Sequence, residues 1–569
     1  MEKPELVELV KKLQHRKKYG LVWEEKLEDV VEQCKRELPV LEEVVERAIE
    51  KDKDGSTNLL IEGDNYHALS VLNYTHANKV DVIYIDPPYN TGQQDFKYND
   101  RWIDKDDEYR HSKWLSFMSK RLTLARDLLN DGGLIFISID DNESAQLKLL
   151  CNDIFKEENL LDVFYIQVRY ASKSLNEKDD FQKLIEQVLI YTKNKTKFKP
   201  NKPSDEYDLN KFRFKVTEKA KGKTLELGRK KVEIFLPGEY EITEEENGSM
   251  EFLKATWASG SVLKGNTSGK FFHNYLETRK DVDGLGVLYK VHGIGEDGIG
   301  YRYFTGPKKE TATKGQFYSG VPLSRRKDID ENGSSRKERP VINFYDYSGD
   351  FGNIRHEGLV DFRSGKKPTK MLKNLINLHR NKDVLVLDFF AGSGSTAEAV
   401  LMLNEDDGGN RRFILCTNNE NNIAEDITHS RIKNVTEGYN STGAIPTNLR
   451  YFRTAFVSKS KVSDDTRREL VKRSTEMICV RENAFEKVAD NKNFKIYRDK
   501  NHVAGILFDL DSISEFKEKI KKQALPAHIY VFSLTNDTFD EDFDDLELKH
   551  ELCPIPESIL EVYRKLFKE

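Results

Sequence analysis

Short apolar runs alternate with helical patterns in two separated stretches of this 569-residue sequence. The first stretch contains the runs NLLIEGD, VDVIYI, GLIFISID and EQVLIYTKN, and the second contains DVLVLDFF and RRFILCT. Runs that are apolar almost throughout are typical of strands buried on both faces of a parallel sheet. The segment from Trp114 to Leu129 has helical periodicity and precedes a Gly-Gly pair, which favours the end of a helix. The alternation predicts an α/β core with a doubly wound sheet that draws strands from both stretches.

The remaining segments predict further domains around this core. We expect the first part of the core at 56–200, the second part at 361–450, and a small charged α/β domain at 451–569. Residues 201–360 are rich in Gly, Lys, Tyr and Phe with weak periodicity, which indicates an inserted domain. Residues 1–55 are expected to be helical, because apolar residues recur there at helical spacing in two sets, Leu6, Val10 and Leu13, and Leu41, Val44 and Ala48.

Composition excludes several classes of protein. The net charge of -6 argues against a uniformly basic nucleic-acid binder, although a local basic cleft remains compatible with it. The five cysteines are scattered without a CxxC pair, so neither a disulfide framework nor a zinc site is indicated, and no metal is expected. The charged N-terminus is unlike a signal peptide, and no apolar run is long enough to span a membrane. A cytoplasmic protein is therefore expected.

The segment DFFAGSGST, from Asp388 to Thr396, follows an apolar strand and begins a helix. Gly392 and Gly394 allow a close approach of the backbone to a ligand, and the free amides at the start of a helix favour a carboxylate. The segment is neither GxGxxG nor a phosphate loop, because no GK[ST] follows. Many glycine-rich turns follow strands, so this motif alone indicates a ligand site only weakly.

The segment Asp86-Pro87-Pro88-Tyr89 directly follows the run VDVIYI. Two prolines make a rigid turn and remove two amide donors, which leaves outward carbonyls, a carboxylate and an aromatic ring. An ordinary turn with a packed tyrosine is one interpretation. The other is a pocket for a planar base that carries an amino group, with Tyr89 stacked on the base. Asp86 and the Pro87 carbonyl would then accept hydrogen bonds from the amino group.

DPPY together with FxGxG resembles the S-adenosylmethionine-dependent amino-methyltransferases of DNA. DPPY comes first here, with the insert between the two motifs, and this order is similar to the circularly permuted beta class. The stretches DPPYNTGQQDFKYND, WLSFMSKRLTLARDLL and GLIFISIDDNE resemble the modification subunit of Type III restriction-modification systems. The resemblance covers about residues 57–200 and 360–425. It implies a Rossmann-like core that binds S-adenosyl-L-methionine and methylates adenine N6 in duplex DNA.

Further residues take expected roles from this resemblance. The family motifs imply that the cofactor is bound by Asp64, Lys367, Asp388, Phe390, Ala391, Gly392, Gly394 and Glu420. Asp388 either holds the cofactor's amino group or caps the following helix. Asp64 either meets the cofactor's adenine or ends a strand, and Lys367 is expected near the cofactor's carboxylate. Glu420 lies later than the acidic residue that usually binds the ribose.

The resemblance also implies partners. Duplex DNA would be recognised by the insert, where basic and aromatic residues interleave in FFHNY, GYRYFTGPKK, KGQFYSG and Ser324-Arg325-Arg326-Lys327. A charged surface over a small aromatic core is the alternative interpretation of those segments. A homodimer and a separate restriction subunit, with its own ATPase and nuclease, are expected from the family.

Three alternatives to adenine methylation fit parts of the sequence. A cytosine amino-methyltransferase shares the chemistry, although serine in place of Asp86 favours cytosine in this class. A methyltransferase for RNA or for a protein amide suits the large insert less well. A DNA-binding subunit with a decayed site conflicts with the presence of Asp86, Tyr89, Gly392 and Gly394.

Overall fold

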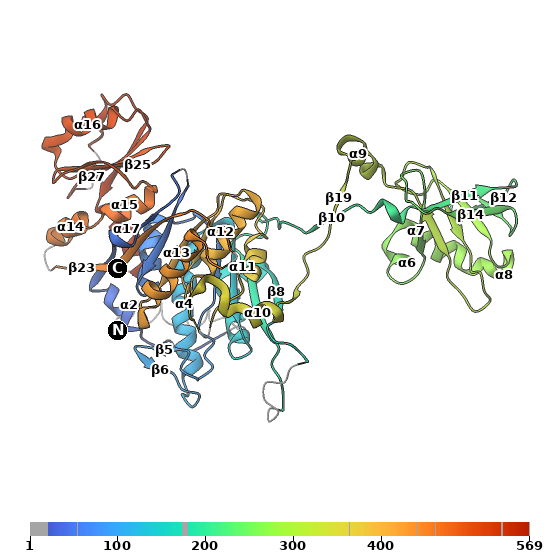
Figure 1. The fold of residues 1–569 in the computed structure, drawn as a ribbon, viewed down its shortest axis with the longest axis horizontal. Helices are drawn as coiled ribbons and strands as arrows, with labels where there is room; N and C mark the ends of the chain where they lie inside the picture. Colours follow the sequence, from blue (N-terminus) through green and yellow to red (C-terminus); the bar gives the residue numbers. More distant parts are fainter. Residues whose placement is uncertain are drawn as a thin grey trace, which may run out of the picture. The chain divides into compact units, whose positions relative to one another are not determined.

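The computed structural model describes residues 21–567 except 54, 173–179, 363–364, 441, 461–462, 536 and 538. The expected helix around Leu6, Val10 and Leu13 lies outside the described residues. The chain forms two compact units (Figure 1). The first contains the described residues up to Asn201 and from Ile342 onward, and the second is Lys202–Val341.

The first unit is α/β and is built on an eleven-stranded mixed sheet. The strands, in the order of the sheet, are β1 (Glu37–Glu43), β23 (Asn448–Ser458), β3 (Thr57–Glu62), β22 (Arg412–Thr417), β21 (Leu385–Asp388), β4 (Val80–Ile85), β7 (Leu129–Ile139), β9 (Ile185–Thr192), β8 (Leu160–Gln167) and β20 (Phe344–Asp346). The strands from β23 to β7 in this order are mutually parallel, whereas β1 and β9 are antiparallel to their neighbours. The short strand β2 (Ile49–Glu50) also pairs with β23.

The two stretches of the chain interleave at the centre of this sheet. β21, from the second stretch, lies between β4 and β22, with Leu387 opposite Ile83 of β4 and Ile414 of β22. Adjacent parallel strands end at the same edge of a sheet, so the loops that follow β4 and β21 begin side by side.

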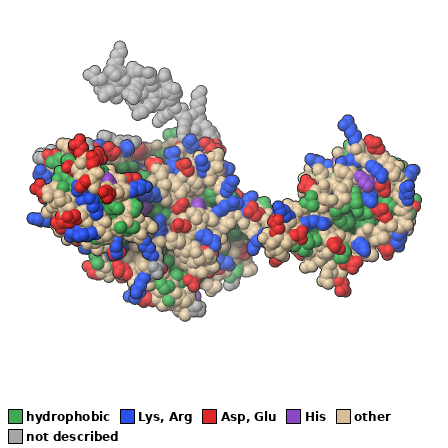
Figure 2. All heavy atoms as spheres, turned by 90° about the horizontal axis from the view of Figure 1, so that it is seen from above, with side chains coloured by type: hydrophobic (Ala, Val, Ile, Leu, Met, Phe, Trp, Pro, Cys, Tyr) green, Lys and Arg blue, Asp and Glu red, His purple; other side chains and the backbone are tan. Residues whose placement is uncertain are grey.

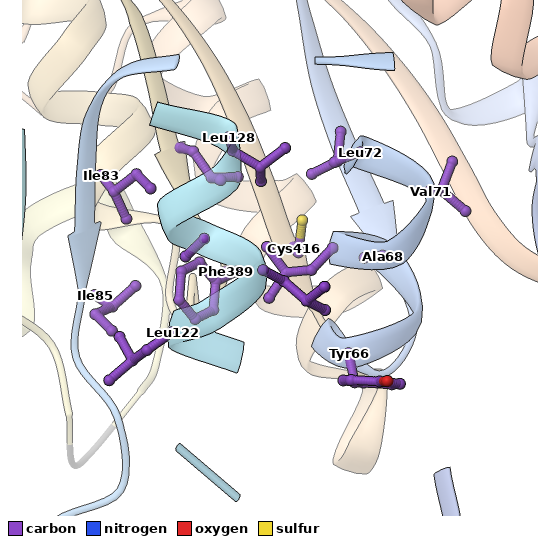
Figure 3. Packing of buried hydrophobic residues seen from close by; sticks show 14 of the residues in the cluster. Tyr66, Ala68, Val71, Leu72, Ile83, Ile85, Leu122, Leu128, Phe389 and Cys416 are labelled. Atoms are coloured by element: carbon purple, nitrogen blue, oxygen red, sulfur yellow. The ribbon is translucent and has the colours of Figure 1, made fainter. Parts of the chain in front are cut away.

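Helices cover the sheet and bury its apolar side chains. α3 (Asn65–Thr75) and α4 (Arg110–Leu128) pack on β4 and β21 through the cluster in Figure 3, with Leu122 and Leu128 of α4 near Ile83, Ile85 and Phe389. α5 (Ser144–Phe155) packs on α4, while α11 (Thr369–Ile376) packs on α12 (Ser395–Asp407). The glycine at the start of α12 and the prolines after β4 fix where the sheet's loops turn.

The prediction of helix around Leu41 is wrong, because residues 37–43 form β1. Leu38, Val40 and Leu41 are buried, and β1 pairs antiparallel with β23 from the far end of the chain. This long-range pairing overrides the helical spacing of apolar residues. The helical segments that the structure describes in this region are the short α2 (Asp29–Cys34) and a 3-10 turn at Val45–Arg47.

Two strands cross the ranges that the sequence suggested for domains. β20 lies within 201–360 but pairs with β8 of the main sheet. β23 runs through residue 450 and also belongs to the main sheet. After β23 the chain forms a five-stranded sheet of β24 (Glu486–Asp490), β25 (Phe494–Arg498), β26 (Val503–Leu507), β27 (Ala527–Phe532) and β28 (His550–Ile555).

The C-terminal sheet is held to the core by two helices. α15 (Thr475–Glu482) packs on α3 and β1, and α17 (Glu557–Phe567) packs on α3. The Tyr563 hydroxyl of α17 donates a hydrogen bond to the Pro39 carbonyl of β1.

The second unit has an antiparallel six-stranded sheet of its own. Its strands, in order, are β12 (Lys223–Leu227), β13 (Lys230–Phe235), β16 (Leu288–His292), β17 (Tyr301–Thr305), β18 (Gln316–Ser319) and β15 (Lys254–Trp257). Lys, Arg, Asp and Glu side chains are interspersed over the face of both units in Figure 2. Within the described ranges, no helix combines the length and the apolar character needed to cross a membrane.

Candidate active site

A cavity of about 680 Å³ lies at the carboxyl edge of the main sheet. Four neighbouring strands deliver residues to it: β3 is followed by Asp64, β4 by Asp86, β21 by Phe390, and β22 by Glu420. Gly392, Pro87, Pro88, Tyr89 and Lys367 also line the cavity. The structure therefore brings both sequence motifs onto one pocket.

The Asp86–Tyr89 turn is tied together by its own side chains. The Tyr89 hydroxyl donates a hydrogen bond of 2.8 Å to Asp86 Oδ1 and lies 3.0 Å from Glu186 Oε2. The Trp114 indole donates a hydrogen bond of 2.8 Å to the Pro88 carbonyl. The Pro88 carbonyl therefore already has a hydrogen-bond partner within the protein. The backbone of the turn is thus fixed against α4.

Lys367 lines the cavity and lies at this turn, and its expected place near a cofactor carboxylate stays a prediction. Its Nζ is 3.2 Å from Asp86 Oδ1 and 2.9 Å from Glu186 Oε2, and it donates a 2.7 Å hydrogen bond to the Tyr89 hydroxyl. Burial raises the pKa of Asp86, and Lys367 opposes that rise. Burial would lower the pKa of Lys367, but the two carboxylates outweigh burial and raise it. One buried cation therefore serves two partly buried carboxylates.

The glycine-rich loop takes a conformation that requires glycine. Gly392 has φ +48°, and a Cβ there would meet no atom closer than 3.8 Å, so the space beside it is open. Gly394 has φ +76° and packs on Thr428, where a Cβ would come within 3.2 Å of the methyl group. The Thr428 hydroxyl holds the Gly392 carbonyl at 2.6 Å. The loop is therefore a rigid, open cradle at Gly392.

Asp388 is engaged by its own loop. Its Oδ1 accepts a 3.0 Å hydrogen bond from the Phe390 amide, and its Oδ2 accepts a 2.5 Å hydrogen bond from the Thr396 hydroxyl. Burial raises the pKa of Asp388 to about 7, against the effect of these hydrogen bonds. Ala391 is also buried, and its amide donates to the Cys416 carbonyl at 3.1 Å. Both residues shape the loop from beneath, and neither lines the cavity.

Asp64 faces the cavity and also supports α3. It accepts a 2.7 Å hydrogen bond from the Tyr66 amide as the N-cap of the helix. Arg121, which is fully buried on α4, lies 3.2 Å from Asp64 Oδ1 and 2.7 Å from Glu28 Oε1. The guanidinium also lies 3.7 Å from the centre of the Phe117 ring. Arg121 therefore holds three residues that line the cavity in place, namely Glu28, Asp64 and Phe117.

Glu420 lines the cavity and forms an ion pair with Lys97. Its side chain is 40% exposed, so it remains able to exchange Lys97 for another partner. Phe117 and Phe390 pack together at 5.9 Å between ring centres and supply an apolar wall.

Most aromatic residues that the sequence placed at a DNA surface are core residues of the second unit. Phe271, Phe272, Phe304 and Phe317 are buried together in one cluster. Tyr275 is 39% exposed, and Lys327 is 74% exposed in its ion pair with Glu331. Lys327 thus remains available to a ligand, whereas Arg302 is largely buried in an ion pair with Asp297, and stacking on these four phenyl rings is excluded.

Two site residues were missed from the sequence. Glu186 lies near the start of β9, in the run EQVLIYT. The available clue to it is that a charged residue begins an otherwise apolar run. Arg121 lies within the helix predicted from Trp114 to Leu129. A charged residue in an amphipathic helix is expected on the solvent-facing side, so the pattern gives no indication that Arg121 is buried.

Comparison with known proteins assigns the family. The family model described as DNA methylase, of the N6/N4 class, matches residues 80–428. The Type III restriction-modification enzyme EcoPI Mod subunit of Escherichia phage P1 is 31% identical over 65% of this chain and 59% of its own length. The Type II methyltransferase M.KpnI of Klebsiella pneumoniae is 29% identical over 68% of this chain and 89% of its own length.

The chain spans about half to three-fifths of the length of the Type III Mod subunits that it matches. Among solved structures, PvuII DNA methyltransferase (cytosine-N4-specific) is similar with a TM-score of 0.32 and 10% identity, over 69% of this chain and 91% of that one. The family model covers most of the first unit's central strands and both motifs of the cavity. The chain belongs to the N6/N4 DNA methylase family.

Proposed function

We propose that this protein transfers a methyl group from S-adenosyl-L-methionine to the N6 amino group of adenine in duplex DNA. The observation that carries the proposal is that the Asp86 loop and the Gly392 loop open onto one cavity, because β4 and β21 are adjacent parallel strands. Two ligands that must react with each other need neighbouring sites of this kind.

The chemistry of the cavity fits the cofactor. The open cradle at Gly392 admits close contact with the backbone, and the Phe117–Phe390 wall suits an apolar portion. The carboxylates of Asp64 and Glu420 suit hydroxyl and amino groups, which are hydrogen-bond donors. When bound there, the cofactor supplies an electrophilic methyl group on a positively charged sulfur.

The protein's part in the reaction is to hold the base. Tyr89 would stack on an everted adenine. The Asp86 carboxylate and the Pro87 carbonyl would accept the two N–H bonds of the amino group, because the Pro88 carbonyl is already used by Trp114. Two acceptors at the amino nitrogen direct its lone pair out of the ring plane toward the methyl donor. Direct transfer of this kind needs no covalent intermediate with the protein.

The alternative target base is cytosine, whose N4 amino group would enter the same pocket. The presence of Asp86 rather than serine favours adenine.

The second unit, Lys202–Val341, is the proposed target-recognition domain, since its exposed basic residues can contact phosphates. Similarity to Type III Mod subunits supports a role in such a system, with a homodimer, a separate restriction partner and a cytoplasmic location as parts of the same proposal.

Label transfer tests this function directly. Purified protein would be incubated with unmethylated genomic DNA and cofactor tritiated in the methyl group, and the digested nucleosides would be separated. We expect label in N6-methyladenine. Asp86→Ala should abolish it, whereas Asp141→Ala, at a carboxylate that is 62% exposed, should retain it. Label in N4-methylcytosine would favour the runner-up, and absence of label with folded wild type would refute the proposal.

A further inference from the structure

A cluster of two histidines and a glutamate lies in the C-terminal sheet, away from the cavity. Glu482 is the last residue of α15, His502 directly precedes β26, and His528 lies on the neighbouring strand β27. One ligand atom from each of the three lies within 4.8 Å of the other two. Because β26 and β27 pair with Ala504 opposite His528, the sheet itself brings the two imidazoles together, 5.1 Å apart between ring centres.

Both imidazoles point at the same carboxylate oxygen. His528 Nδ1 lies 2.5 Å from Glu482 Oε2, and His502 Nε2 lies 3.3 Å from the same atom. His502 Nε2 is buried, and its 3.3 Å contact with Glu482 Oε2 lacks the geometry of a hydrogen bond. A buried ring nitrogen without a hydrogen bond is uncommon and calls for a ligand. Donors on a tetrahedral zinc ion with bonds of about 2.0–2.1 Å lie about 3.3 Å apart. The separation of His502 Nε2 and Glu482 Oε2 matches this value, whereas His528 Nδ1 would move away from Glu482 by about 0.8 Å to admit the ion.

The groups behind these three side chains are those of a metal site. The Asp499 carboxylate lies 2.9 Å from His502 Nδ1, which fixes the ring so that Nε2 faces Glu482. Tyr530 donates a 2.5 Å hydrogen bond to Glu482 Oε1, which leaves Oε2 for the cluster. Carboxylates that hold the far nitrogen of a histidine are the usual support for a histidine that binds metal.

We propose that Glu482, His502 and His528 bind a divalent late transition-metal ion of the zinc type. Two imidazoles and one carboxylate are a donor set for such an ion, and the 40% exposure of the His528 side chain leaves room for a water as fourth ligand. The ion would join the end of α15 to β26 and β27. Since α15 also packs on α3, the site would stiffen the attachment of the C-terminal sheet to the core.

Metal binding requires neutral imidazoles, so the affinity for zinc should fall as the solution becomes more acidic.

The test measures metal uptake by the full-length, tag-free protein, independent of methylation. Protein stripped with EDTA and dialysed would be titrated with Zn²⁺ at pH 7.5, and Co²⁺ would be used as a visible-absorption probe. We expect one Zn²⁺ per chain at this site and a rise in Tm on binding. Glu482→Gln and His528→Ala should each weaken binding at least tenfold, and Asp499→Asn should weaken it about 10- to 100-fold.

The matched control is His550→Ala, on β28 of the same sheet, where the ring bonds to the Leu548 carbonyl. It should bind Zn²⁺ as the wild type does. His528 is the most exposed member of the cluster, so we expect His528→Ala to disturb folding least among the variants of its three residues. Circular dichroism would verify that this variant is folded. The proposal is overturned if stripped wild type takes up no Zn²⁺, or if folded His528→Ala and Glu482→Gln bind it with unchanged affinity.

Discussion

Lys367 Nζ lies 3.2 Å from Asp86 Oδ1, so a lysine that precedes α11 neutralises the carboxylate at the end of β4. Glu186 Oε2 lies 2.9 Å from the same nitrogen. Two carboxylates thus share one buried cation in the proposed base pocket. Since an acceptor for an amino group must be ionised to be strong, Lys367 would keep Asp86 in the form that the proposed role requires.

Replacing this lysine should shift the pH dependence of methyl transfer. In Lys367→Met the pKa of Asp86, already raised by burial, loses the opposing effect of the cation and rises further. A higher pKa means a smaller ionised fraction below it, so the acid limb of kcat should move to higher pH by about one unit or more. Activity at pH 7 should fall roughly tenfold or more, with partial recovery near pH 9. Initial rates of tritium transfer across pH 6–9 would measure this.

Lys370→Met is the control for Lys367→Met, because Lys370 lies on the same segment but is 66% exposed, in an ion pair with Asp350. Its pH profile should match the wild type. If Lys367→Met lowers the rate of methyl transfer by the same factor at every pH, the lysine acts on something other than the ionisation of Asp86.

Tyr89 has two separable parts. Tyr89→Phe removes only the hydroxyl that donates to Asp86 and should cost about 1–3 kcal/mol in transition-state free energy, since a partly buried carboxylate loses a donor. Tyr89→Ala also removes the ring and should cost about a further 1–3 kcal/mol, the usual contribution of stacking on a base. The measurement is kcat/KM for DNA. Tyr109→Phe, at a residue that is 45% exposed, should be unchanged, and equal losses in Tyr89→Phe and Tyr89→Ala would contradict stacking.

The meeting of the two motifs is the part of the site that sequence patterns predict best. Asp86 and Gly392 each follow an apolar strand, and the loops after parallel strands gather at one edge of a sheet. That local signal was enough to expect a shared pocket, although the two motifs are about 300 residues apart in the sequence.

Features that depend on long-range partners were not predictable. Leu41 has neighbours at helical spacing, yet it lies in a strand because β23 supplies the pairing edge. No local pattern indicates that Lys367 lies beside Asp86, since the charge of a lysine fits a solvated residue or an anion site equally. Glu482, His502 and His528 lie at no spacing typical of metal sites, and only the pairing of β26 with β27 reveals them.

Arg121 should be a large contributor to stability. It is fully buried, 2.7 Å from Glu28 Oε1, whose side chain is 5% exposed. Arg121→Met leaves Glu28 buried without its cation, which should cost about 3–5 kcal/mol in the free energy of unfolding. The urea midpoint measures the loss. Arg126→Met, at a partly exposed residue one turn later on α4, should shift the midpoint much less, and equal shifts would exclude the buried ion pair as the cause.

Asp388, at the start of the glycine-rich loop, makes the stability of the protein depend on pH. Burial raises its pKa in the folded protein to about 7 from an ordinary value of 3.8. Between these two values the folded protein holds a proton that the unfolded chain has released. Stability therefore falls as the pH rises through this window, and the loss is complete above pH 7.

Asp388→Asn should remove this dependence, because an amide is neutral throughout the window and can still accept from the Phe390 amide. We expect wild type to lose stability relative to Asp388→Asn as the pH rises from 5 to 8, measured as the difference between their Tm values at each pH. Other titrating groups are shared by both proteins and cancel in that difference. Parallel profiles of Tm against pH for the two proteins would contradict this prediction, because they would mean that Asp388 stays ionised in the folded protein. The hydrogen bonds from Phe390 and Thr396 would then outweigh the effect of burial on its pKa.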